Sequence, residues 1–176
     1  CVIFRKAVLC TATLCFLGVL SATSHAEVTR FEIVQRDDFA DGQEFGEAGA
    51  YERIAGRVHY EVDPEAPANQ HIVDLKLAPR NKRGRVEFSA DLYILAPKNL
   101  SRGNRALLYD VNNRGGLTAL PHLNYAPGSN RPIDKAHAGD GFLMRHGFTL
   151  VWSGWDGELL PDKNRLRLFP PLASES

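Results

Sequence analysis

Cysteine is scarce in this chain of 176 residues, and all three copies lie near its start, at Cys1, Cys10 and Cys15. A product that loses this stretch cannot be held together by disulfides. An excess of positive charge is also missing, because 21 basic residues balance 21 acidic ones. We therefore expect no nucleic-acid partner, since proteins that bind nucleic acid carry a basic patch or stripe.

The chain also lacks the common motifs of catalysis. There is no G-x-S-x-G nucleophile elbow, because Ser153 has no glycine two residues before it. No two histidines have the H-x-x-x-H spacing of a metal-binding helix. The sequence therefore predicts no catalytic residue, no metal site and no cofactor within these residues.

No hydrophobic run is long enough to cross a membrane. The longest stretch of apolar and small residues, 7–20, has 14 residues, whereas a spanning helix needs about 20. It follows a basic pair at positions 5 and 6 and precedes Ser-His-Ala at 24–26, which has small residues at both specificity positions of a cleavage site. These features predict a signal peptide over 1–26, cleaved after Ala26, and a periplasmic or secreted product with no stable membrane span. A retained anchor is the alternative.

What remains after position 26 has the composition of a soluble protein. Its 150 residues carry 19 basic and 21 acidic side chains, a net charge of −2. A chain of this length can bury roughly two-thirds of its surface, so a core without disulfides is feasible.

Residues 27–98 are predicted to form a β-rich region. Apolar and polar residues alternate over 54–62, 71–77 and 86–94, as they do in strands with one buried face. The polar, basic segment 78–85 between the last two is expected to be a hairpin turn. The sequence thus predicts an antiparallel β layer.

Residues 99–176 show a different pattern. Two nearly continuous apolar stretches, 106–111 and 148–152, are expected to be strands covered on both faces. A loop over 112–132 and a short helix over 140–146 separate them, which makes a βαβ unit with parallel strands. Only one short helix is available to cover two faces, so we expect a mixed α/β fold that is the front part of a longer protein.

The loop after the first of these strands is the strongest candidate site. A core strand that runs into Asn113, Arg114, Gly115 and Gly116 aims backbone N–H groups at the crevice where open α/β sheets bind ligands. Such N–H groups form the oxyanion hole of α/β-hydrolases. An ordinary turn that contains glycine and asparagine is the alternative.

Three further side chains near the two strands are candidates with two interpretations each. Asp110 is either a functional acid or, more simply, a carboxylate held by Arg114 or a neighbouring donor. Trp152 and Trp155 either line the wall of a substrate pocket or pack in the core, which is the commoner place for such residues.

Several long segments resemble one family. The matching segments are 49–56, 74–81, 108–115, 139–147 and 151–155, of which LYDVNNRG at 108–115 is an example. They look like secreted bacterial proteins described as α/β-hydrolase domain-containing. The resemblance implies a β-rich region, 27–98, that leads into an incomplete α/β-hydrolase domain, 99–176. The nucleophile, acid and histidine would lie downstream, and only the loop 113–116 maps onto the family's oxyanion position.

Two functional hypotheses follow. The first is the amino-terminal fragment of an exported, esterase-like serine hydrolase that acts on a small-molecule ester. The alternative is a secreted β-rich module that binds a ligand or carbohydrate without catalysis, with Trp152, Trp155 and nearby tyrosines as its platform.

Overall fold

The computed structural model describes residues 26–162 and 164–172 of the chain. The predicted signal peptide over 1–26 therefore lies, apart from Ala26, outside the described residues. The two predicted regions, 27–98 and 99–176, both contribute strands to one sheet, because β3 (Val86–Pro97) of the first pairs with β5 (Thr149–Ser153) of the second.

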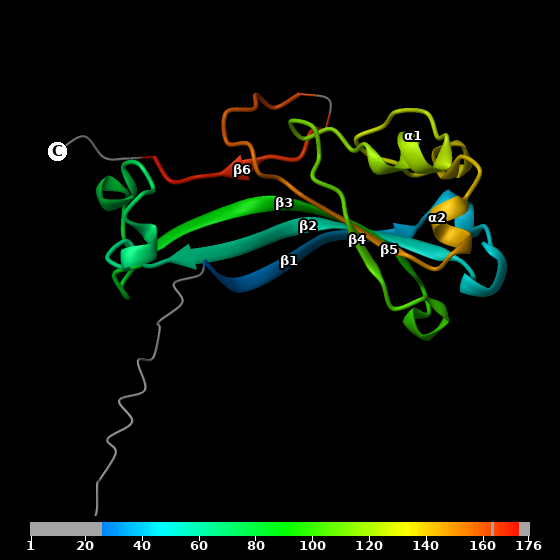
Figure 1. Cartoon of the computed structure of the whole chain (residues 1–176), viewed down its shortest axis with the longest axis horizontal. Coiled ribbons are helices and arrows are strands. Elements are labelled where there is room, and N and C mark those ends of the chain that lie inside the picture. Colours follow the sequence, from blue (N-terminus) through cyan, green and yellow to red (C-terminus); the bar gives the residue numbers. More distant parts are fainter. Residues whose placement is uncertain (1–25, 163, 173–176) are drawn as a thin grey trace, which may run out of the picture.

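Six strands form a mixed and mostly antiparallel sheet that is accompanied by a few short helices (Figure 1). Hydrogen-bonded neighbours follow the order β1-β2-β3-β5-β4, and β6 pairs with β3. Every pairing is antiparallel except that of β4 with β5. The strands are β1 (Glu27–Asp38), β2 (Tyr51–Val62), β3 (Val86–Pro97), β4 (Leu107–Tyr109), β5 (Thr149–Ser153) and β6 (Leu168–Phe169).

The strands predicted over 54–62 and 86–94 are confirmed as β2 and β3. They pair along their whole length, from Tyr51 opposite Pro97 to Val62 opposite Val86. β1 pairs with the other edge of β2, which confirms the antiparallel layer predicted for the first region. The period-two pattern succeeds here because each of these strands places successive side chains on opposite faces.

The prediction of a strand over 71–77 is wrong. This segment consists of turns that end in a single 3₁₀ turn, η4 (Leu75–Leu77), and Asp74 before it has a left-handed φ of 58°. Leu75 packs with Val62 and Val86 in a small second core, so its burial comes from a folded-back connection and not from a sheet face. The turn expected over 78–85 is present, but it joins η4 to β3 and does not join two strands.

The helices are few and short. The predicted helix over 140–146 is confirmed in a shorter form as α2 (Phe142–Arg145), and Gly147 with φ 72° provides the expected left-handed stop. The N-cap position is Gly141 and not Asp140, although Oδ1 of Asp140 accepts the N–H of Phe142 (2.8 Å). A second helix, α1 (Ala119–Asn124), lies inside the segment predicted as a loop. The remaining 3₁₀ turns are η1 (Ala40–Gly42), η2 (Gly46–Ala48), η3 (Pro67–Asn69), η5 (Leu100–Arg102) and η6 (Lys135–Ala138).

The main core lies on one face of the sheet. Tyr93 and Leu95 of β3 and Leu150 and Trp152 of β5 are all buried there, because each pair occupies alternate positions that share a face. Met144 of α2 is also fully buried in this cluster. Figure 1 shows α1 above this face, with β6 and its flanking loops beside it.

The opposite face of the β4–β5 pair is only partly covered by the described chain, and its exposed residues lie on β4. The parallel pairing predicted for these strands is confirmed, with Leu107 opposite Thr149. The expectation that both of their faces would be buried is wrong, because Leu107 and Tyr109 are 61% and 49% exposed. Both helices pack on the core side, so only the alternate residue Leu108 is packed against the core. β4 is consequently an edge strand with outward apolar side chains.

No helix in the described ranges is both long and apolar enough to cross a membrane.

Gly56 gives a test of the β1–β2 contact. A Cβ at this position would lie 2.1 Å from the carbonyl oxygen of Glu32 on β1. We expect Gly56→Ala to lower the free energy of unfolding by about 1–3 kcal/mol in urea titrations, as overpacking does. Gly128→Ala is the matched control, because a Cβ there meets nothing within 4 Å, and it should change stability by less than about 0.5 kcal/mol. Equal effects of the two substitutions would contradict this close approach.

Candidate functional site

The candidate loop forms a tight turn over 113–116, which residues 110–112 connect to the end of β4. Asn113 and Gly116 exchange two backbone hydrogen bonds, each 3.0 Å long. The two residues between them have positive φ, 49° for Arg114 and 80° for Gly115. Positive φ at both central positions is the mark of a type I′ turn, which asparagine and glycine usually occupy. Arg114 is therefore held in a conformation that is unfavourable for its residue type.

The hydrogen bonds of this turn decide which N–H groups face outward. The N–H groups of Asn113 and Gly116 donate to each other's carbonyl oxygens. The N–H of Gly115 donates to Oδ1 of the buried Asn112 (2.7 Å), whose Nδ2 in turn donates to the carbonyl of Ser153 (2.6 Å). Within residues 113–116 of the described chain, only the N–H of Arg114 has no acceptor. The oxyanion role of this loop stays a prediction, and it rests on that one amide.

The side chain of Arg114 pairs with Asp156. Its Nε lies 3.3 Å from Oδ2 of Asp156, a carboxylate that is 11% exposed. Arg114 is itself 64% exposed, so this ion pair is one of the weakly stabilising kind. The pair anchors the turn to the segment that follows β5.

Asp110 is satisfied by three neighbouring residues. Its Oδ2 accepts the backbone N–H of Thr118 (2.9 Å), the backbone N–H of Ala119 (2.7 Å) and the indole N–H of Trp152 (2.6 Å). Burial acts to raise the pKa of Asp110, but these hydrogen bonds outweigh it and hold the pKa below its ordinary value. The structural interpretation of Asp110 is confirmed, with these donors in place of Arg114.

The two tryptophans lie in different surroundings. Trp152 is fully buried and makes an edge contact with Tyr93, with ring centroids 6.1 Å apart. It therefore presents no surface to solvent. Trp155 is 49% exposed, and its indole N–H donates to the carbonyl of Asn112 (2.8 Å). Both indoles thus tie the end of β4 to the end of β5, and Trp155 alone has a face that a ligand can reach.

The segment before β6 packs against the candidate loop. The N–H of Leu166 donates to the carbonyl of Gly115 (3.0 Å), and a Cβ on Gly115 would lie 2.6 Å from the carbonyl oxygen of Leu166. Glycine is required at 115 both for its φ and for this contact. Sequence reasoning missed the packing, because residues 157–176 show no periodic pattern that identifies an element.

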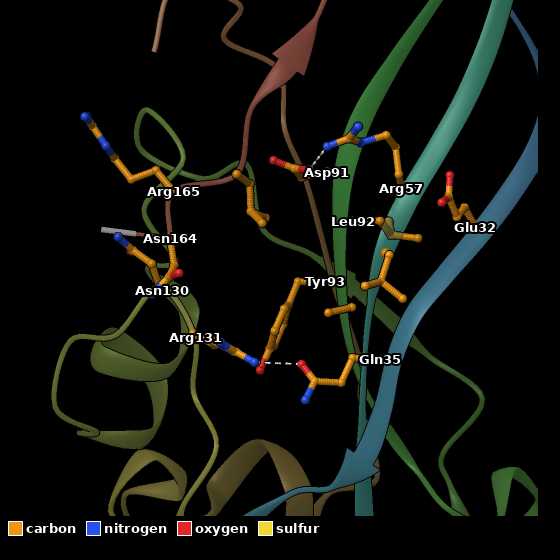
Figure 2. A pocket seen from close by; sticks show the side chains of 14 residues that line it. Glu32, Gln35, Arg57, Asp91, Leu92, Tyr93, Asn130, Arg131, Asn164 and Arg165 are labelled. Carbon is orange, nitrogen blue, oxygen red and sulfur yellow. Dashed lines mark hydrogen bonds and ion pairs between the residues drawn. The ribbon is translucent and has the colours of Figure 1, made fainter. Parts of the chain in front are cut away.

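A cavity of about 410 Å³ lies on the other side of this segment, over the middle of the sheet (Figure 2). Strands β1, β2 and β3 line it from one side, and residues 130–131 and 164–166 line it from the other. Tyr93 extends into it, and burial raises the pKa of its hydroxyl, which donates to the carbonyl of Pro132 (2.5 Å). No sequence pattern indicates this cavity, because Arg57 and Asp91 alternate with apolar residues as solvent-facing strand residues do.

The described residues hold no group of three or more His, Cys, Asp and Glu side chains that could bind a metal ion. Comparison with protein-family models, curated proteins and solved structures finds no match to this chain.

Asp110 gives a test of these contacts. Asp110→Asn keeps an oxygen for the three N–H donors but removes the charge, so we expect a loss of about 1 kcal/mol in the free energy of unfolding at pH 7. The native pKa of Asp110 is lowered, so its stabilising effect is present above the unfolded pKa and disappears as the pH falls through the folded value. The difference between wild type and variant should therefore shrink below about pH 4 in urea titrations.

Asp140→Asn is the control, because Asp140 is exposed and accepts a single N–H from Phe142. It should change the free energy of unfolding by no more than about 0.5 kcal/mol. If the difference in unfolding free energy between wild type and Asp110→Asn stays constant down to about pH 2, the charge of Asp110 contributes nothing to stability.

Proposed function

We propose that this chain is the amino-terminal part of an exported, esterase-like serine hydrolase with an α/β-hydrolase-like sheet. Its product is periplasmic or secreted, its substrate is a small-molecule ester, and it needs no cofactor. The nucleophilic serine belongs to a part of the polypeptide outside these 176 residues, since no G-x-S-x-G elbow occurs within them.

The observation that carries the proposal is the state of β4. It pairs with β5 along one edge, and no described strand pairs with its other edge. Leu107, Tyr109 and Val111 are exposed beside that edge, at 61%, 49% and 70%. A bare apolar strand edge is a site of aggregation that native proteins cover. A further strand beside β4, with helices over the exposed face, would bury these residues as α/β sheets do.

The local order of elements also favours this fold. β4 leads through residues 110–118 into α1, and the neighbouring parallel strand β5 ends at Ser153 on the same side. In α/β-hydrolases a strand–loop–helix of this kind supplies one oxyanion N–H, and the residue after the nucleophile supplies the other. The likeness is at the level of the fold, so the activity has to be tested at the site itself.

The chemistry assigned to this chain is limited to stabilising negative charge. A downstream serine would attack the acyl carbonyl of the ester, and the carbonyl oxygen would become an oxyanion. The free N–H of Arg114 would donate to that oxygen. Removing one oxyanion donor typically lowers kcat by about 10²–10³-fold. The hydrogen bonds within the turn hold this N–H in position before the substrate arrives.

The native exported polypeptide, purified from its own host, tests the proposal. We expect an intact mass well above 19.5 kDa, and one serine outside residues 27–176 that reacts with a fluorophosphonate probe. The measurements are intact mass spectrometry and mapping of the labelled peptide. A polypeptide that ends near Ser176 and takes no label would contradict the proposal and would favour the non-catalytic binding module.

The loop is tested in the same polypeptide by a matched pair of substitutions. Gly115→Val places a branched side chain against Leu166 at a position with φ 80°, and it should slow fluorophosphonate labelling by at least about a hundredfold. Gly128→Val, in open space, should label at the wild-type rate. Equal labelling of both variants would remove the loop from the mechanism.

A further inference from the structure

The cavity over the middle of the sheet has a function that ester hydrolysis does not require. We propose that it binds a small organic carboxylate, with the acid group at Arg131 and an apolar body beside the ring of Tyr93. This binding would take place within the present chain, whether or not a hydrolase domain follows.

The cavity owes part of its space to a small residue on β2. Ala55 lines it with a single methyl group, whereas Arg57, the next residue on the same face of the strand, carries a long side chain. Its volume of about 410 Å³ falls in the range of pockets that bury small molecules. Val34 and Leu166 add apolar surface to the wall, so a ligand with an apolar body would displace water from it.

The charges around the cavity are unequal. Arg57 is paired with Asp91 (3.2 Å) and lies over the ring of Phe169, 4.0 Å from its centroid. Arg165 is paired with Asp162 (3.8 Å). Arg131 differs, because within the described ranges its side chain forms no ion pair with a carboxylate, and its Nη2 donates to Oε1 of the neutral amide of Gln35 (2.7 Å). The Arg131 end of the cavity therefore carries a positive charge without a paired carboxylate.

Arg131 is also held in place. The hydrogen bond to Gln35 links it to β1, as Figure 2 shows, and the next residue, Pro132, accepts the hydroxyl of Tyr93. A guanidinium fixed in this way loses little conformational freedom when it binds, and its planar fork matches the two oxygens of a carboxylate.

The chemistry of a carboxylate suits this end of the cavity. A carboxylate is a pure acceptor, and the guanidinium of Arg131 is a pure donor whose hydrogen bond to Gln35 uses one of its N–H groups. Inorganic phosphate would supply acceptors too, but it would leave the apolar wall in contact with water.

Calorimetric titration of the chain with benzoate tests the proposal. We expect saturable binding at one site with a dissociation constant of about 1 mM or tighter, and no comparable binding of the neutral isostere benzamide. Arg131→Met should weaken benzoate binding at least about tenfold, because it removes a charge-assisted contact. Arg105→Met is the control, because it removes the same charge at an exposed position outside the cavity lining, and it should bind like wild type.

A second variant tests the location of the ligand without a change of charge. Ala55→Leu fills the floor of the cavity, and it should abolish benzoate binding while circular dichroism confirms a folded sheet. Benzamide binding as tight as that of benzoate, or phosphate binding tighter than it, would overturn the proposal. So would unchanged benzoate affinity in Arg131→Met or in Ala55→Leu, or the absence of saturable binding in wild type.

Discussion

The carboxylate of Asp110 is the contact on which the end of β4 depends. One of its oxygens accepts the backbone N–H groups of Thr118, the N-cap of α1, and of Ala119, its first residue. The same oxygen accepts the indole N–H of the core residue Trp152. A charge at the end of an apolar strand is unfavourable unless such donors surround it. The same donors fix where α1 begins relative to β5, and the loop between Asp110 and Thr118 must close over that distance. The type I′ turn at 113–116 lies within that loop.

The two faces of the sheet have different surroundings. On one face, Leu95, Leu150 and Trp152 form a core under the helices, and the cavity with Arg131 lies farther along the same sheet. On the other face, Phe31 and Ile33 of β1 are 62% and 57% exposed. The outward side chains of β4, Leu107 and Tyr109, are exposed to a similar extent. This exposure connects the fold to the proposed function, because a patch of exposed apolar side chains often marks a surface that another part of the protein or a partner covers.

The sequence correctly predicted those strands in which apolar and polar residues alternate because the two faces of the strand have different surroundings. Residues 54–62 and 86–94 were found in this way, and the apolar run 148–152 gave β5. The same pattern failed at 71–77, because a folded-back connection can bury Leu75 against Val62 without forming a strand. The prediction that both faces of 106–111 are buried was also wrong. Apolar composition shows which side chains a strand can bury, but it does not show whether a helix or another sheet is present to cover them.

Much of the candidate site could not be predicted from local sequence. The glycines at 115 and 116 indicated a special turn, and its position after a core strand was correct. Which N–H groups the turn uses internally depends on Asn112 and Leu166, and these contacts come from three-dimensional packing. The cavity is formed by residues up to 134 positions apart, from Glu32 to Leu166, so no local pattern contains it.

Amide hydrogen exchange at Tyr109 in the native exported polypeptide distinguishes a β4 edge that is paired with another strand from one that is bare. The N–H of Asp110 donates to Val151 of β5, so alternation along the strand directs the N–H of Tyr109 to the unpaired edge of β4. If further chain completes the sheet, this amide should be protected as strongly as that of Asp110. Exchange of Tyr109 at the rate of an unprotected amide, with Asp110 still protected, would show that β4 is a true edge and would contradict the account.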